Sequence, residues 1–157
     1  MVSADPIAGT PTSNTPGTGL NREGNQMQTF EVIVPDAMRP YYETLHFAPA
    51  VKEGGHLYCS GMLGLGPDGT PIADPGAQFT QIFESIKDLL SLAGATLADI
   101  LEVTSYHVNL GKHLQTFVKV KEQYIPAPYP AWTAVGVNEL ALPGALVEVK
   151  VVARSSE

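Results

Sequence analysis

The segment YPAWTAVGVNELALPGALVEVKVVA, residues 129–153, has the pattern of two β-strands joined by a turn. Residues 132–137 and 145–153 are rich in valine, and the Pro-Gly pair at 143–144 is typical of a turn. The second strand carries a carboxylate, Glu148, among its valines. A charged side chain in such a strand needs either water or a functional role, so Glu148 is the first candidate for a site.

Three further strands are predicted upstream of this unit. Residues 29–35, 56–65 and 101–110 combine β-branched residues with alternation of apolar and polar positions. Residues 36–55, between the first two strands, contain two prolines and a Gly-Gly pair. We therefore expect a loop, short extended pieces and a turn there.

Two helices complete the predicted fold. The first begins after Asp74, which can cap it, has Pro75 in its first turn, and stops at Gly94. The second covers roughly residues 112–125 and ends at Pro126. The order is ββαβαββ, which predicts an α+β domain with a mixed sheet and both helices on one face.

The strand at 145–153 also predicts how the other face of the sheet is covered. Its two alternating sets are Ala145, Val147, Val149, Val151 and Leu146, Glu148, Lys150, Val152. Neither set is uniformly polar, as a face exposed to water would be. We expect another copy of the chain to cover this face, with Glu148 near the shared surface.

Composition limits the possible partners and location. The chain has 157 residues and a formal net charge of −7, with no cluster of Lys or Arg, so neither nucleic acid nor a membrane is an expected partner. Residues 29–157 are predicted to form one domain, and residues 1–28, rich in Thr, Pro, Gly, Ser and Asn, a flexible tail. A single cysteine, Cys59, and the lack of a secretory signal favour a cytoplasmic location.

Four segments together resemble the Rid family, the reactive intermediate deaminases, also called YjgF-like proteins. The similarity covers residues 43–154 and rests on HFAPAVKEGGHLYCSGMLGLGPDG, DILEVTSYHVNL, YPAW and PGALVEVKVVA. The resemblance implies a chorismate-mutase-like fold and a homotrimer with clefts between subunits. It also implies a hydrolase acting on C–N bonds, which converts a small-molecule enamine or imine to a carbonyl compound and ammonia.

The resemblance assigns roles to several positions. Glu148 matches the glutamate that positions water, Ser60 and Gly61 match a Ser-Gly motif, and Phe47 occupies a position where many members have tyrosine. Trp132 stands where deaminating members have the arginine that holds the substrate carboxylate. Without that guanidinium the bidentate grip is lost, so a non-standard substrate is implied.

Each candidate has an alternative interpretation as a structural residue. Glu148 is either a general base toward water or a strand residue paired with Lys150. Trp132, with Thr133 beside it, either forms a flat pocket wall or anchors the core or an interface. His107 either acts in the cleft or is a hydrogen-bonded core histidine.

The remaining candidates are weaker. Ser60 and Gly61 either contact a ligand or simply end a strand, and Arg39, Lys112 and His113 are possible substitutes for the missing cation or ordinary surface residues. The four histidines lack metal-ligand spacing, so neither a metal nor another cofactor is predicted.

Two functions from different classes remain open. The first is an enamine or imine hydrolase in an inter-subunit cleft, and the second is a non-catalytic, small-molecule-binding or chaperone-like trimer. Ribonuclease activity, sometimes ascribed to relatives, fits poorly with the negative charge.

Overall fold

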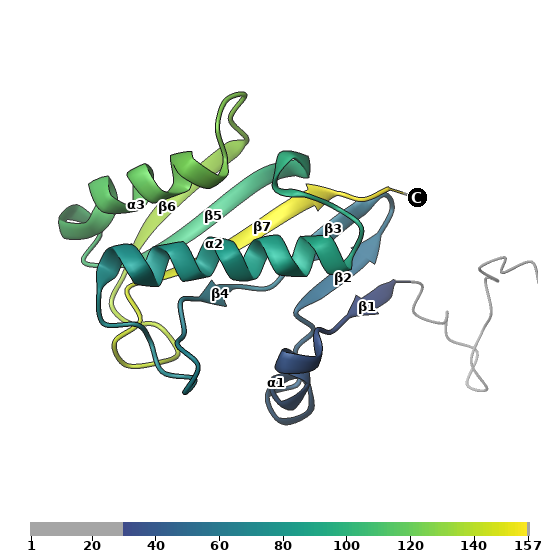
Figure 1. The fold of residues 1–157 in the computed structure, drawn as a ribbon, viewed down its shortest axis with the longest axis horizontal. Coiled ribbons are helices and arrows are strands. Elements are labelled where there is room, and N and C mark those ends of the chain that lie inside the picture. The colour runs from purple at the N-terminus through teal and green to yellow at the C-terminus, as the bar shows by residue number, and fades with distance from the viewer. Residues whose placement is uncertain (1–29, 157) are drawn as a thin grey trace, which may run out of the picture.

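A computed structural model describes residues 30–156, which form one seven-stranded sheet with two long helices on one face (Figure 1). The predicted tail, residues 1–28, lies outside the described residues. The strands are β1 (Glu31–Ile33), β2 (Ala50–Glu53), β3 (His56–Cys59), β4 (Met62–Leu63), β5 (Ile100–Val108), β6 (Ala131–Val137) and β7 (Val147–Arg154).

The sheet is mixed, as predicted. Its order is β1-β2-β3-β7-β5-β6, and β4 also pairs with β7. Only the β5–β6 pair is parallel among these pairings, and all the others are antiparallel. The parallel strands β5 and β6 are joined by a helical crossover. Parallel neighbours need such a long connection, because a short turn can join only antiparallel strands. The last strand of the chain, β7, is therefore central.

The two predicted helices are present and cover the same face of the sheet (Figure 1). The first is α2 (Pro75–Leu92), and an oxygen of Asp74 accepts a hydrogen bond from the Ala77 amide at 2.8 Å, as expected of an N-cap. The second is α3 (Leu110–Tyr124). None of the helices in the described part of the chain is both long and apolar enough to cross a bilayer.

Residues 36–55 are more ordered than predicted. They contain a 3₁₀ turn, η1 (Asp36–Met38), a short helix, α1 (Arg39–Leu45), and strand β2. The loop prediction was wrong for α1 because Pro40 lies in the first helical turn, where no amide donor is needed. Gly54 and Gly55, both at positive φ, form the predicted turn between β2 and β3.

The predicted strand at 56–65 is interrupted at Ser60 and Gly61. The Ser60 amide donates to the Pro49 carbonyl at 2.8 Å, and its hydroxyl donates to the Ala48 carbonyl at 2.6 Å. The amide bond continues the register of β2 and β3 by one pair, from Ala50–Cys59 to Pro49–Ser60, before β4 begins. The interruption leaves Gly61 against β7.

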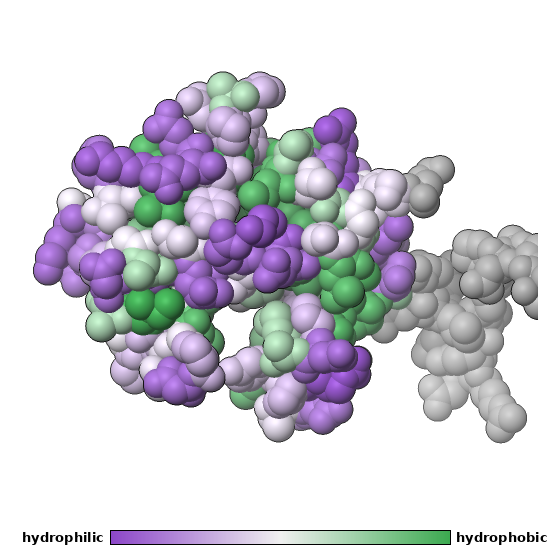
Figure 2. Space-filling model, in the orientation of Figure 1, coloured by the Kyte–Doolittle hydropathy of each residue, from purple (hydrophilic) through white to green (hydrophobic). Residues whose placement is uncertain are grey.

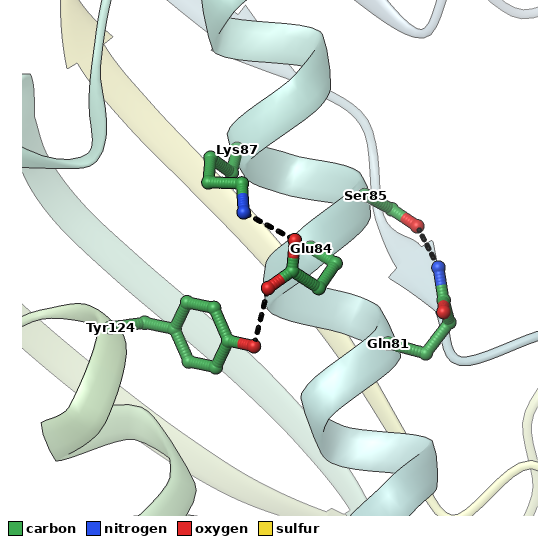
Figure 3. A network of polar contacts seen from close by, with 5 residues as sticks. All are labelled: Gln81, Glu84, Ser85, Lys87 and Tyr124. Atoms are coloured by element: carbon green, nitrogen blue, oxygen red, sulfur yellow. Dashed lines mark hydrogen bonds and ion pairs between the residues drawn. The ribbon is translucent and has the colours of Figure 1, made fainter.

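A polar link joins the two helices at the surface (Figure 3). The Tyr124 hydroxyl on α3 donates to Glu84 on α2 at 2.7 Å, and Lys87 pairs with the same carboxylate. This hydrogen bond is the main reason that the pKa of Tyr124 is raised to about 12. Figure 2, which views the helix-covered side, shows hydrophilic side chains over much of α2 and α3.

The residues of β7 alternate between the two faces of the sheet. Val147, Val149, Val151 and Ala153 are at most 1% exposed, and they face α2 and α3. The intervening side chains, which include Glu148 and Lys150, point to the opposite face. The sheet therefore places these two charged groups on the face that the long helices leave open.

Candidate functional site

A cavity of about 550 Å³ lies on the open face of the sheet. Glu148 on β7 is paired with Tyr106 on β5, and both reach the cavity, whereas their neighbours Val147 and His107 are fully buried on the helix side. The lining residues are Gly61, Tyr106, Val137, Glu139, Leu140, Ala141, Glu148 and Lys150.

Glu148 and Gly61 are in close contact in this cavity. A Cβ atom added to Gly61 would lie 2.0 Å from Glu148 Oε1 and 2.6 Å from Glu148 Cδ. The carboxylate therefore occupies the space that a side chain at position 61 would fill. The structure thus brings together two of the predicted site residues, which are 87 positions apart in the sequence.

Three cavity residues with functional groups were not predicted as site residues. Tyr106 follows from the β5–β7 register, because it is paired directly with Glu148. Lys150 lies two positions from Glu148 on the same side of β7 and is exposed. Glu139 belongs to the connection between β6 and β7. Alternation within β7 indicated Lys150, but no local pattern indicated Glu139.

Ser60, Phe47 and Thr133 lie outside the lining of the cavity. The Ser60 hydroxyl donates to the carbonyl of Ala48, the residue that follows the half-buried Phe47. Thr133 is paired with Thr104, which is paired in turn with Lys150, so Thr133 shares the open face with Glu148. A direct contact of these three residues with substrate remains a prediction.

Trp132 does not line this cavity, because it lies on the opposite face of the sheet. It pairs with Val103, which is fully buried on the helix side, and its ring centroid is 5.9 Å from that of Phe117 on α3. Its indole N–H donates to Ser105 at 2.9 Å, and the Lys121 ammonium lies 4.7 Å from the ring centroid. Trp132 and Glu148 therefore do not line the same cavity within one chain, and a contact of Trp132 with substrate in a cleft between subunits stays a prediction.

His107 is likewise on the helix side, so the prediction that it acts in the cleft with Glu148 is wrong for this cavity. Its Nε2 shares a hydrogen bond of 2.8 Å with the Ser105 hydroxyl, and its ring packs edge-on against Phe117. Within residues 30–156, His107 Nδ1 is buried without a hydrogen-bond partner. The core interpretation of His107 is the one that these contacts support.

Burial of His107 predicts a pH dependence of stability. Burial lowers the pKa of His107, and the nearby His113 lowers it further. Below the ordinary histidine pKa of about 6.5, His107 is protonated in the unfolded chain but stays neutral in the folded chain until the pH is lower. The free energy of unfolding should therefore fall as the pH drops from 7.5 to 5.5. Urea titrations should show a shallower fall for His107→Leu, and equal slopes in the two proteins would contradict this assignment.

The other candidate cations and the cysteine do not contribute to the cavity. Arg39, Lys112 and His113 are absent from its lining, and His113 is buried against Phe79. Cys59 is buried, and burial raises its pKa to about 11. In the described residues, no group of three or more His, Cys, Asp or Glu side chains is arranged to hold a metal ion.

Comparison with known proteins identifies the family. The model of the family described as endoribonuclease L-PSP matches residues 38–155. The RutC family protein YjgH of Escherichia coli is 36% identical over 126 residues, which are 80% of this chain and 95% of that protein. The 3-aminoacrylate deaminase RutC of Acinetobacter baylyi is 34% identical over 127 residues, 78% of this chain and 96% of that protein.

A solved structure agrees with these sequence matches. The structure of protein YJGH superposes with a TM-score of 0.74 at 35% identity, and the match covers 81% of this chain and 97% of that one. The expectation of a Rid-type fold is thereby confirmed. The chain belongs to the endoribonuclease L-PSP family, which is the YjgF or Rid family.

Proposed function

We propose that this protein hydrolyses a reactive enamine or imine in the cavity on the open face of the sheet, with Glu148 as the general base. The observation that carries the proposal is the placement of the Glu148 carboxylate over Gly61 in a cavity large enough for a small molecule. A relative that is 34% identical is named as a 3-aminoacrylate deaminase, which supports this class of reaction. Glu148 is the catalytic residue of the proposal.

The proposed reaction needs water, one carboxylate and the substrate. Protonation by solvent, at carbon for an enamine or at nitrogen for an imine, first gives an iminium ion. Glu148 then accepts a proton from water while the water oxygen attacks the C=N carbon, and the π electron pair moves to nitrogen, which becomes a neutral amine. The protonated Glu148 returns its proton to the amine, which leaves as ammonia while the hydroxyl loses its proton to form C=O. The sum is imine plus water to carbonyl plus ammonia.

The substrate is proposed to be non-standard for the family. The resemblance places Trp132 at the position of the carboxylate-binding arginine, and its indole contacts Ser105 and Phe117 in this chain. A tryptophan offers one N–H donor and no positive charge, so it cannot replace a bidentate guanidinium. The substrate must therefore be held by other groups of the cavity.

Ammonia release is the measurement that tests this function. The purified protein is incubated with 2-imino acids, generated in situ from amino acids, and with carboxylate-free and aromatic imines. Ammonia formation above the uncatalysed rate on either set supports the hydrolase. Ligand-dependent thermal stabilisation without turnover on any of these compounds would instead favour the non-catalytic binding protein.

Replacing Gly61 by alanine should impair activity more than folding. The new Cβ would lie 2.0 Å from Glu148 Oε1, so the flexible carboxylate must move away from its position. A displacement of about 1 Å in a catalytic group can cost about 100-fold in rate, so we expect kcat/KM for ammonia release to fall between about 10-fold and 100-fold. The melting temperature should change by only a few degrees.

Gly111→Ala is the matched control for that substitution. Gly111 lies in α3 with a helical backbone, and an added Cβ would meet no atom within 4 Å. Alanine is favoured over glycine in a helix, so this variant should keep full activity and gain a little stability. Equal activity in Gly61→Ala and Gly111→Ala would show that the position of the Glu148 carboxylate does not matter for the reaction.

We also propose that the open face is shared between copies in a homotrimer. Tyr58 and Val135 lie on this face and are 44% and 38% exposed. Large apolar side chains on an exposed sheet face are unusual unless another surface covers them. A second copy against this face would also close the cavity from water. Light scattering on the purified protein should give a mass of three chains, and a monomer at micromolar concentration would contradict the proposal.

The family description does not extend the proposal to RNA. The formal net charge is −7, and the described cavity carries two carboxylates and one ammonium group. A surface that binds a phosphate backbone gains its affinity from clustered positive charge. The charge distribution therefore favours a small substrate.

A further inference from the structure

We propose that Gln78 is a positioning residue: it holds the connection between β6 and β7, residues 138–146, in place, and thereby sets how tightly the substrate binds. Gln78 belongs to α2 and is absent from the lining of the cavity, so it acts through the residues that it holds. The effect on catalysis rests on the proposed function, whereas the anchoring of the connection does not.

Gln78 is a buried amide in a helix that otherwise buries apolar side chains. It is 1% exposed, and the other buried residues of α2 are phenylalanine, isoleucine and leucine. Its Nε2 donates to the carbonyls of Ile72 and Gly144 at 2.8 and 3.1 Å, and its Oε1 accepts from the Leu146 amide at 2.7 Å. Both N–H donors of the side chain and its carbonyl oxygen can therefore be satisfied, as a buried amide requires.

These hydrogen bonds join two connections that are far apart in the sequence. Ile72 precedes α2, whereas Gly144 and Leu146 lie 66 and 68 positions after Gln78. The two connections run side by side below the start of α2 in Figure 1, and a Cβ added to Gly144 would lie 3.8 Å from Pro71 Cβ. In the described part of the chain no backbone hydrogen bond joins the two connections, so the Gln78 amide is the polar link between them.

The connection between β6 and β7 also forms one wall of the cavity. Three of its residues line the cavity: Glu139, Leu140 and Ala141. The connection contains no helix or strand, so it lacks a ladder of backbone hydrogen bonds and takes its position from the bonds near its ends. Leu146 makes two of these bonds, because its amide binds Gln78 and its carbonyl accepts from the Val108 amide at 2.8 Å.

Other contacts hold the proposed catalytic residue. Glu148 is paired with Tyr106 on β5 and with Leu63 on β4, and these pairings do not involve the side chain of Gln78. Loss of the Gln78 amide should therefore move the wall of the cavity while Glu148 keeps its place on β7. Such a change weakens substrate binding and spares the chemical step, so it raises KM and leaves kcat almost unchanged.

Two substitutions test the anchor, and two more are controls. Gln78→Leu removes all three hydrogen bonds, whereas Gln78→Glu keeps an acceptor for the Leu146 amide and loses both N–H donors. Gln81→Leu removes a glutamine of the same helix whose amide binds Ser85, one turn away (Figure 3). Ile86→Val trims a fully buried side chain further along α2, so it controls for a general loss of core packing.

Hydrogen exchange followed by mass spectrometry measures the anchoring without turnover. In Gln78→Leu, peptides from residues 138–146 should exchange about tenfold faster than in wild type, because the Leu146 amide has lost its acceptor and the connection opens more often. In Gln81→Leu and Ile86→Val the same peptides should exchange as in wild type. Unchanged exchange in Gln78→Leu would overturn the inference, whatever the activity of the variant.

Steady-state ammonia release from 2-iminobutanoate measures the effect on substrate binding. Gln78→Leu should raise KM about tenfold and keep kcat within about threefold of the wild-type value, since the wall moves and the base does not. Gln81→Leu and Ile86→Val should keep both constants. A loss that falls mainly on kcat, no loss at all, or the same rise in KM in Ile86→Val would overturn the role of Gln78 in substrate binding.

Gln78→Glu adds a test by pH and serves if Gln78→Leu does not fold. Burial beside two carbonyl oxygens raises the pKa of a carboxyl group, and the protonated acid can donate to one of these oxygens. The KM of Gln78→Glu, relative to wild type, should therefore fall as the pH drops from 8 to 6, and a ratio that does not change with pH would contradict the donor role of Gln78. Faster exchange in Gln78→Leu without ammonia release in wild type would overturn the hydrolase and support the anchoring.

Discussion

Replacing Glu148 by glutamine is expected to lower kcat/KM for ammonia release by about 10²-fold to 10⁴-fold, the range for loss of a general acid or base. Glutamine keeps the size of the side chain and its place over Gly61, but its amide cannot accept a proton from water. The fall should appear mainly in kcat, because the step that is lost is proton transfer. Steady-state ammonia release on the best substrate of wild type measures it.

Glu139→Gln is the matched control for this experiment. Glu139 lines the same cavity but belongs to the connection between β6 and β7, away from Gly61. Removing its charge should change kcat/KM less than fivefold, and any change on an anionic substrate should be a gain, because one repelling carboxylate is lost. Full activity in Glu148→Gln would remove the proposed mechanism, and a larger loss in Glu139→Gln would transfer the role of base to that residue.

Replacing Phe117 by alanine should cost about 3–5 kcal/mol in the free energy of unfolding, the range for truncating a buried phenylalanine. Phe117 is fully buried, and its ring contacts those of Phe79, Phe83, His107 and Trp132, with centroids between 4.8 and 5.9 Å away. The substitution would leave a void between α3 and the sheet. Urea denaturation at a fixed protein concentration measures the loss.

Two further variants, Leu92→Ala and Phe117→Leu, are the controls for the loss of stability in Phe117→Ala. Leu92 ends α2 and is 59% exposed, so its truncation should change the free energy of unfolding by no more than about 0.5 kcal/mol. Phe117→Leu keeps most of the volume and should cost less than Phe117→Ala, which gives a measurable value if the alanine variant does not fold. A loss below about 1 kcal/mol in Phe117→Ala would contradict the central packing role of this ring.

The helices and the mixed sheet could be predicted because their signals are local. Asp74 and Pro75, which are adjacent in the sequence, mark the start of α2. The strand–helix–strand order of β5, α3 and β6 favours a parallel pair of strands. The failure at α1 also has a local cause. A proline inside a helix interrupts it, whereas a proline in the first turn is compatible with it. The composition of residues 36–55 does not show which of these positions Pro40 has, and the structure places it in the first turn of α1.

The candidate site was only partly predictable for a different reason. Alternation within β7 correctly put Glu148 and Lys150 on one side and the valines on the other. For His107 and Trp132, the apolar neighbours did not reveal which face of the sheet meets the helices. That choice follows from the pairing of His107 with Val147 and of Trp132 with Val103, both of which are buried under the helices.

Thus the fold and the candidacy of Glu148 came from patterns within single segments, because helical and strand periodicities are properties of consecutive residues. The cavity came from contacts between segments. Gly61 meets Glu148, and Tyr106 and Lys150 join them, only because β4 and β5 both pair with β7 in a particular register. Register depends on how the whole sheet packs against its helices, so only the folded chain could show which of these side chains share a site.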